Sequence, residues 1–277
     1  MAGYFGVMNN SFVFTATAEQ QDGITVKSAR ELDAMRRAGR VVAWTIEALM
    51  GAVRPGITTE ALDVISRTEM ARHGAKPSFL GYRGFPATIC TSINEEIVHG
   101  IPGDKVLRDG DIVKLDCGAI VDGIHADSAV TVGVGKIAEE QEELLRVTRL
   151  SLEAGIKASR GGARVGDIGI AIEGYVATQG QYGVVREYVG HGIGRRLHEE
   201  PQIPNYAGSS RGALLRPGMA IAIEPMVNLG TWRTRMLDDG WTVLTADGKL
   251  SAHFEHTMII TDGEAEVVTR RKDEGSF

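Results

Sequence analysis

The sequence is poor in cysteine: its 277 residues include only Cys90 and Cys117. Two cysteines cannot build a disulfide framework, so the sequence indicates a reducing, cytoplasmic setting. No apolar run is long enough to span a membrane, since Val41–Val53 is interrupted by Glu47 and falls short of the roughly 20 residues required. Residues 1–23 contain no Lys or Arg, which excludes a signal peptide and an Arg-rich transit peptide. We treat 1–23 as an N-terminal extension.

An excess of positive charge is also missing. The chain carries 30 Lys and Arg against 36 Asp and Glu, a formal net charge of −6. This balance argues against broad binding of nucleic acids or anionic membranes, which requires a basic surface. With 43% hydrophobic and 24% charged residues, the composition is otherwise that of an ordinary globular protein, long enough for one large core or two fused half-domains.

The stretch 113–127, V-K-L-D-C-G-A-I-V-D-G-I-H-A-D, has the pattern of a β-hairpin. Two β-branched, apolar segments flank Asp122-Gly123, and an Asp-Gly turn in such a setting is a strong hairpin signal. The hairpin would bring Asp116 and Asp127 together. Taken alone, two such acids are usually solvated strand ends. Clustered carboxylates, however, raise each other's pKa unless a cation neutralises them.

An internal repeat strengthens the case for a site. The segment 107–116, which begins L-R-D-G and ends in an acid, is echoed by 215–224, which begins L-R-P-G, at an offset of 108. Likewise 125–127 is echoed by 253–255 at an offset of 128, again as a His followed two residues later by an acid. Repeats deserve early attention because they define architecture. Here they yield four matched carboxylates: Asp116, Asp127, Glu224 and Glu255.

The helical pattern is duplicated as well. Apolar spacing, a Ser28/Glu31 capping box and glycine stops predict four helices, at about 28–50, 58–73, 138–158 and 165–179. The glycines at 56 and 74 recur at 162 and 180, both at an offset of 106. We therefore expect an α+β fold with two pseudo-symmetric halves, 24–135 and 136–277, packed as one domain with the acids between them.

Three histidines lie near these acids in the sequence, and glycines flank two of them, His99 and His191, where we expect tight backbone turns. A lone histidine is more often structural than functional. One imidazole together with four carboxylates, however, is a donor set for a divalent metal. His191 with the four acids would suit two ions roughly 3.5–4 Å apart. His99 and His198 would then remain as donors for a developing oxyanion.

Seven further motifs follow one another along the chain. They are G-Y-R-G-F-P (Gly81–Pro86), S-I-N-E-E-I-V-H-G-I-P (Ser92–Pro102), L-D-C-G followed by D-G-I-H-A-D (115–127), G-H-G-I-G-R-R-L-H-E-E-P (Gly190–Pro201), I-E-P-M (Ile223–Met226), D-G-W-T (Asp239–Thr242) and F-E-H-T (Phe254–Thr257). Together they resemble the motifs of type I methionine aminopeptidases. The similarity covers about 24–269, and its motifs are specific.

This resemblance implies the pita-bread fold, in which two related halves surround a dinuclear metal site. By position it implies five metal ligands: Asp116, Asp127, His191, Glu224 and Glu255. Asp127 and Glu255 would bridge the ions, and a hydroxide between the ions would attack the scissile carbonyl. His99 and His198 correspond to the family's catalytic histidines, and Glu224 to its proton shuttle. The α-amine of the substrate would lie near Asp116.

The resemblance also implies a pocket for the methionine side chain, lined by Phe79, Tyr82, Phe85, Cys90, Leu197 and Trp241. An apolar, aromatic slot suits a thioether because sulfur–aromatic contacts are favourable. Phe79 and Leu197 stand where many relatives have Cys and an aromatic residue. Without the resemblance, ordinary core positions would be the simpler interpretation. We expect Cys90 and Cys117 to be buried and inert.

The expected activity is removal of the initiator methionine from nascent chains, at a Met followed by a small residue. The implied cofactors are two divalent ions, Co, Mn, Fe or Zn, which the sequence does not distinguish. We expect a cytoplasmic monomer, with the ribosome surface as a further partner. The chain lacks both a Cys/His-rich zinc segment before the domain and the type II insertion between Glu224 and Glu255. The alternatives are an Xaa-Pro aminopeptidase of the same fold and a non-catalytic binding module.

Overall fold

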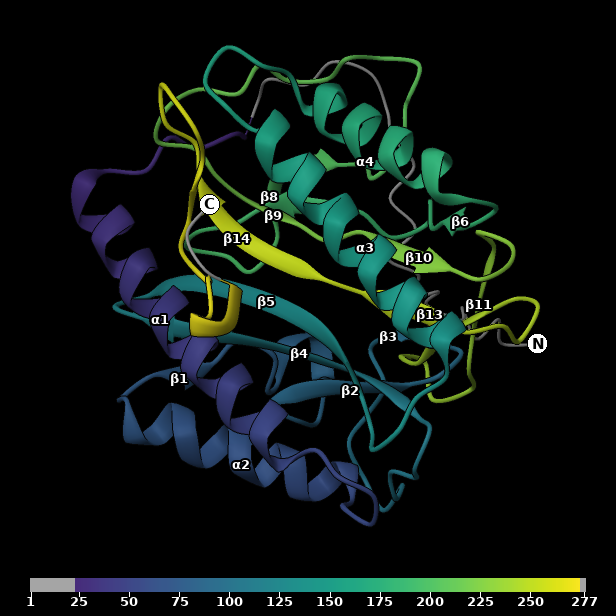
Figure 1. Cartoon of the computed structure of the whole chain (residues 1–277). Helices are drawn as coiled ribbons and strands as arrows, with labels where there is room; N and C mark the ends of the chain where they lie inside the picture. Colours follow the sequence, from purple (N-terminus) through teal and green to yellow (C-terminus); the bar gives the residue numbers. More distant parts are fainter. Residues whose placement is uncertain (1–22, 275–277) are drawn as a thin grey trace, which may run out of the picture.

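A computed structural model of the protein describes residues 23–274 as an α+β arrangement in which helices lie over a long curved sheet (Figure 1). The expected N-terminal extension lies outside the described residues, except for Gly23. The described part contains four α-helices: α1 (Ala29–Ala52), α2 (Thr59–Arg72), α3 (Glu139–Ala158) and α4 (Val165–Gln179). None of these is long and apolar enough to cross a membrane.

One sheet of nine strands dominates the described residues, in the order β1-β4-β5-β14-β9-β7-β8, with β2 on β4 and β15 on β14. Its strands are β1 (Lys76–Pro77), β2 (Ile89–Ile93), β4 (Ile112–Val121), β5 (Ile124–Gly133), β7 (Gly190–Gly192), β8 (Glu199–Ile203), β9 (Ala220–Ile223), β14 (Glu255–Ile259) and β15 (Glu266–Val267). Two small sheets flank it: β13 (Ser251–His253), β10 (Met226–Asn228) and β6 (Gly183–Val184), and β11 (Thr234–Met236), β12 (Val243–Thr245) and β3 (Glu96–Val98).

The predicted hairpin is present as β4 and β5. Val121 pairs with Ile124 across the turn, and Asp122 and Gly123 have φ angles of 50° and 79°. Two consecutive residues with positive φ are what a type I′ turn requires, which explains the Asp-Gly pair. Ten residues of each strand pair in register, so the turn fixes which residues of β4 and β5 face the same side.

The predicted helices are confirmed to within a few residues. At the start of α1 the Glu31 carboxylate accepts a hydrogen bond from the Ser28 backbone N–H at 2.9 Å, and the Ser28 hydroxyl accepts one from the Glu31 N–H. This is the expected capping box, which satisfies donors that the first turn leaves unpaired. After α2, Gly74 has the positive φ of 67° that a glycine stop supplies.

The two halves meet where β5 pairs with β14, with Ala129 opposite Glu255. On one side β4 pairs with β5, and on the other β9 pairs with β14. The repeated acids therefore lie symmetrically about this junction. Asp127 and Glu255 lie on the central strands β5 and β14, and Asp116 and Glu224 lie on β4 and at the end of β9. This arrangement confirms the expected α+β class with related halves. The exact division at 135/136 stays a prediction.

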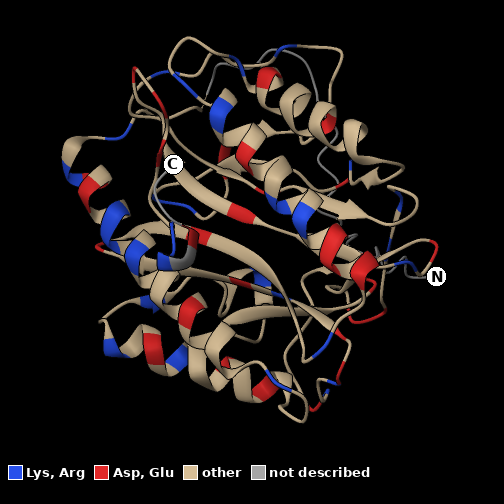
Figure 2. Ribbon diagram, in the orientation of Figure 1, with Lys and Arg blue, Asp and Glu red and all other residues tan. Residues whose placement is uncertain are grey.

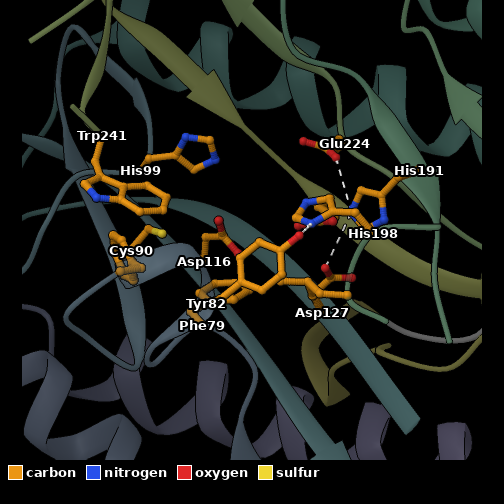
Figure 3. Close-up of a pocket in the computed structure, with 13 residues that line it drawn as sticks. Phe79, Tyr82, Cys90, His99, Asp116, Asp127, His191, His198, Glu224 and Trp241 are labelled. Atoms are coloured by element: carbon orange, nitrogen blue, oxygen red, sulfur yellow. Dashed lines mark hydrogen bonds and ion pairs between the residues drawn. The ribbon is translucent and has the colours of Figure 1, made fainter. Parts of the chain in front are cut away.

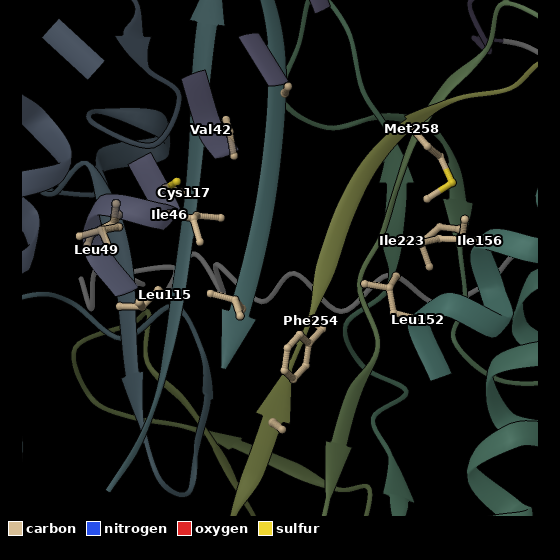
Figure 4. Packing of buried hydrophobic residues seen from close by; sticks show 14 of the residues in the cluster. Val42, Ile46, Leu49, Leu115, Cys117, Leu152, Ile156, Ile223, Phe254 and Met258 are labelled. Carbon is tan, nitrogen blue, oxygen red and sulfur yellow. The ribbon is translucent and has the colours of Figure 1, made fainter. Parts of the chain in front are cut away.

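Side-chain alternation along the strands gives the large sheet one hydrophobic face, which packs against the helices, and one face that carries the candidate ligands. On β4, Leu115 and Cys117 pack with Ile46 and Leu49 of α1 in the main hydrophobic cluster (Figure 4). Asp116 lies between these two residues on the strand and therefore faces the other side. Successive residues of a strand face opposite sides, so one face binds the helices and the other is left for polar groups. Full burial of each such aliphatic side chain contributes about 1.5–3 kcal/mol.

Candidate active site

Strand register gathers the first candidate ligands on the sheet face away from the helices. Asp116 of β4 lies opposite Ala129 of β5, and Ala129 lies opposite Glu255 of β14. All three therefore point to the same side, with the small Ala129 between the two acids. Asp127 lies two residues before Ala129 on β5 and shares that side.

The second half supplies the remaining two ligands to the same face. Ala222 of β9 lies opposite both Thr257 of β14 and His191 of β7. Thr257 is two residues beyond Glu255, so His191 projects to the acid-bearing side. Glu224 follows directly after β9, two residues beyond Ala222. All five predicted ligands thus line one pocket (Figure 3).

The distances between these groups suit a metal centre. The Nε2 atom of His191 lies 3.6 Å from Asp127 Oδ2 and 3.7 Å from Glu224 Oε1. One ligand atom from each of Asp127, His191 and Glu255 lies within 4.8 Å of the others. The Nδ1 atom of His191 is 2.8 Å from the Gly192 carbonyl oxygen. Because a carbonyl can only accept, Nδ1 carries a proton, which leaves Nε2 as the nitrogen that would bind a metal ion.

The electrostatics of the cluster favour a bound cation. Burial raises the pKa of Asp116, Asp127, Glu224 and Glu255, and the charge of Asp127 raises the pKa of the other three further. The Oδ1 atom of Asp116 is buried without a hydrogen-bond partner among residues 23–274. Divalent metal ions would offset this repulsion and supply the missing partner. Four carboxylates and one neutral imidazole form a donor set for such ions, so the residues fit the metal that the sequence implied.

His99 and His198 lie in the same pocket as neutral imidazoles. Burial lowers the pKa of His99 to about 4, and burial with the neighbouring His191 lowers that of His198 well below its usual value. His99 has a positive φ of 61°, a strained conformation for a residue with a side chain. Its ring packs edge-on against Tyr188 with centroids 5.7 Å apart. Both histidines can offer an N–H near the acids.

The glycines beside His191 have a different role from the one expected. Gly190 to Gly192 form the extended strand β7, so the prediction of a tight turn there is wrong. A Cβ atom on Gly190 would lie 2.4 Å from the Ala222 oxygen, and one on Gly192 would lie 2.1 Å from the Glu200 oxygen. Glycine is needed because neighbouring backbone approaches closely on both sides of His191.

The six residues expected to hold a methionine side chain also line this pocket, whose empty volume is about 510 Å³ including the part open to solvent. Phe85 and Trp241 meet edge to face, with ring centroids 5.0 Å apart. Cys90 is buried and free, as is Cys117, and burial raises the pKa of both thiols. The metal donors and an aromatic slot are therefore adjacent.

Two features of the site were not expected from the sequence. The Thr257 hydroxyl contacts Asp127, with Oγ1 2.9 Å from Oδ1. A buried ion pair joins Lys27 to Glu199, beside His198, with Nζ 2.9 Å from Oε2. The F-E-H-T motif does hint at Thr257, because residues two apart on a strand share a face. No local pattern indicates the contact of Lys27 with Glu199.

Comparison with known proteins agrees with this geometry. The model of metallopeptidase family M24 matches residues 33–262. The chain is 51% identical over 247 residues to methionine aminopeptidase 1 of Bacillus subtilis, covering 89% of this chain and 99% of that protein. A crystal structure of methionine aminopeptidase from Thermotoga maritima has a TM-score of 0.87 and 44% identity, covering 90% of this chain and all of that one.

A more distant similarity bears on the fold alone. The prolidase from Pyrococcus furiosus has a TM-score of 0.72 at 20% identity, and the match covers 89% of this chain but 66% of that one. The same architecture thus occurs in a longer protein with another activity. Over nearly its whole described length, the chain matches methionine aminopeptidases much more closely, and it therefore belongs to the methionine aminopeptidases of metallopeptidase family M24.

Proposed function

We propose that this chain removes N-terminal methionine from polypeptides with two divalent metal ions held by Asp116, Asp127, His191, Glu224 and Glu255. One observation carries the proposal: a five-donor cluster and an aromatic slot share a single pocket. Bound ions would lower the pKa of a water molecule and polarise the scissile carbonyl. The kind of ion, Co, Mn, Fe or Zn, depends on availability as well as on these donors.

The positions of the strands support bridging by two of the acids. Asp127 and Glu255 belong to the inner strands β5 and β14, whereas the other three donors come from elements on either side. An ion nearer β4 would be held by Asp116 together with the inner acids. An ion nearer β9 and β7 would be held by Glu224 and His191 together with the same inner acids. Asp127 and Glu255 would therefore be shared by both ions.

The remaining groups are assigned roles in binding and proton transfer. The methionine side chain would occupy the slot, where its sulfur meets aromatic rings. Asp116 would hold the free α-amine, which restricts cleavage to the first residue. His99 and His198 would donate hydrogen bonds to the substrate backbone as charge develops. Glu224 would accept a proton from the attacking water and deliver it to the leaving amine.

The substrate in the cell is proposed to be a nascent chain that begins with Met followed by a small residue. We also propose that the protein acts in the cytoplasm as a monomer, with the ribosome surface as a further partner. The net charge of −6 supports the expectation that it has no nucleic-acid specificity of its own.

The test is a metal-dependence assay on two peptides. The protein is stripped with chelator, Mn²⁺ or Co²⁺ is added back, and release of the first amino acid is followed from Met-Gly-Xaa and from Ala-Pro-Xaa. We expect metal-dependent release of methionine from the first peptide alone. Cleavage of only the second would mean an Xaa-Pro aminopeptidase. If the folded, metal-loaded protein cleaved neither peptide, it would be a binding module.

A further inference from the structure

Tyr82 makes a polar contact that its place in the aromatic slot does not require. Its hydroxyl oxygen lies 2.9 Å from Nδ1 of His198, a residue 116 positions away (Figure 3). The two rings are 5.4 Å apart between centroids and tilted by 35°. Phe79 and Phe85 line the same slot with plain phenyl rings. A hydroxyl in an apolar slot is unfavourable unless it is hydrogen-bonded, and His198 supplies that bond.

The direction of this hydrogen bond follows from the two groups. A neutral imidazole has one N–H and one lone pair, and the nitrogen of His198 that faces the Tyr82 oxygen at 2.9 Å is Nδ1. A phenol O–H is a much stronger acid than a neutral imidazole N–H, and an imidazole nitrogen is a better acceptor than a phenol oxygen. The hydroxyl of Tyr82 therefore donates to Nδ1, which leaves the hydrogen on Nε2.

The backbone holds Tyr82 in place for this contact. Its N–H donates to the Phe79 carbonyl at 2.9 Å, and its carbonyl accepts from the Phe85 N–H at 2.9 Å. Arg83 and Gly84 beside it both have positive φ, at 49° and 91°, so the turn is sharply defined. The tyrosine is thus fixed at both ends, through its backbone and through its hydroxyl.

We propose that Tyr82 is a positioning residue whose hydroxyl fixes His198 as the Nε2–H tautomer and so makes it a hydrogen-bond donor to the substrate carbonyl. The inference rests on the role given to His198 in the proposed function. In the opposite tautomer Nε2 would present a lone pair, which repels a carbonyl oxygen that is gaining negative charge. The ring of Tyr82 lines the slot, and its hydroxyl orients the histidine.

The first measurement is kinetic, on the metal-loaded enzyme with Met-Gly-Xaa. Tyr82→Phe removes the hydroxyl and keeps the ring, so we expect kcat to fall about tenfold to hundredfold while KM changes less than about twofold. Tyr206→Phe removes a hydroxyl outside the pocket and serves as the control. Replacement of Tyr82 by 4-aminophenylalanine restores a donor and should recover part of the rate. An unchanged kcat in Tyr82→Phe would overturn the proposal.

The second measurement reads the tautomer directly. Nitrogen-15 NMR of histidine-labelled, zinc-loaded protein distinguishes protonated from unprotonated ring nitrogens, and His198→Ala assigns the signal among seven histidines. We expect a protonated Nε2 and an unprotonated Nδ1 in the natural protein, and a mixture of tautomers in Tyr82→Phe. An Nδ1–H tautomer in the natural protein, or an unaltered spectrum in the variant, rules the proposal out.

A double-mutant cycle separates this inference from the proposed function. In the His198→Ala background, Tyr82→Phe should cause no further loss of kcat, because the hydroxyl acts through the histidine. An equal loss in both backgrounds would contradict the positioning role. If His198→Ala itself keeps full activity, the role of His198 in the proposed function is wrong. The spectra of the Tyr82 variant would still show whether the hydroxyl sets the tautomer.

Discussion

The Thr257 hydroxyl joins the two halves of the molecule at Asp127. Its Oγ1 atom accepts a hydrogen bond from the Asp127 N–H at 3.0 Å and lies 2.9 Å from Asp127 Oδ1 and 2.8 Å from the Asp127 carbonyl oxygen. Thr257 belongs to β14 of the second half and Asp127 to β5 of the first. A candidate bridging ligand is therefore held by a side chain that is not itself a ligand.

Thr257→Val should weaken metal binding. The substitution keeps the shape and removes the hydroxyl, so Asp127 loses a partner that fixes its carboxylate and its backbone. Loss of such outer partners typically costs about 10–100-fold in metal affinity. Isothermal titration calorimetry of the metal-stripped protein with Mn²⁺ measures the change in affinity. Thr257→Ser, which retains a hydroxyl, is the matched control. Equal affinity in the valine variant would show that the contact has no role in ligand placement.

Ala129 should tolerate no larger side chain. It lies between Asp116 and Glu255 in the same cross-strand row, is 1% exposed and points toward the metal donors. Ala129→Leu would place a branched side chain where the ions are proposed to lie, so we expect metal binding and turnover to be lost although no ligand has changed. Ala129→Gly, which adds no volume, should keep both. A leucine variant with intact metal affinity would contradict the proposed position of the centre.

Much of the fold follows from local patterns in the sequence. Asp122-Gly123 forms the turn between β4 and β5, and the Ser28/Glu31 pair starts α1. Both signals depend on residues at most three positions apart. The repeat offsets also placed four acids at equivalent points, because alternation on a strand fixes which residues share a face. Together these features bring the candidate ligands to one side of the sheet.

The contacts that hold the site were beyond such patterns. Tyr82 meets His198, and Thr257 meets Asp127, across separations of 116 and 130 residues. Only the packing of segments from different parts of the chain decides these partners. The prediction that Gly192 lies in a turn was wrong because its close neighbour comes from another segment of the chain. The sequence shows that a small residue is present there, but the neighbouring Glu200 backbone explains why it is small.

Glu224→Gln and Asp127→Asn should nearly abolish turnover while the protein stays folded. An amide is a weak metal donor and cannot relay a proton, so we expect kcat to fall by at least about 10³-fold. Each change removes one buried carboxyl group from a mutually repelling cluster, so the metal-free fold should not lose stability. Peptide assays with saturating Mn²⁺ and circular dichroism test both points. Close to full rate in either variant would refute the assigned role.

A buried polar contact on the helix side of the sheet provides a pH-dependent prediction. The Nε2 atom of His256 lies 3.2 Å from Glu274 Oε1, and Arg271 also pairs with this carboxylate. Burial opposes ionisation of Glu274, but the hydrogen bond from His256 and the charge of Arg271 outweigh it and lower the pKa from 4.5 to about 2. A carboxyl group with a lowered pKa stabilises the folded state only while it is ionised.

Glu274→Gln should therefore destabilise the protein at neutral pH and not in acid. A pKa lowered from 4.5 to about 2 corresponds to up to about 3 kcal/mol of folding stability. This contribution is complete above the unfolded pKa of 4.5 and disappears as the pH falls toward 2. Urea unfolding of the metal-stripped natural protein and of the metal-stripped variant, between about pH 3 and pH 7, measures the difference in their free energies of unfolding. This difference should narrow as the pH falls. If the two proteins differed by the same free energy of unfolding across this range, Glu274 would act through packing. A contribution from the attraction between the ionised carboxylate and Arg271 must instead decline as the carboxylate is protonated.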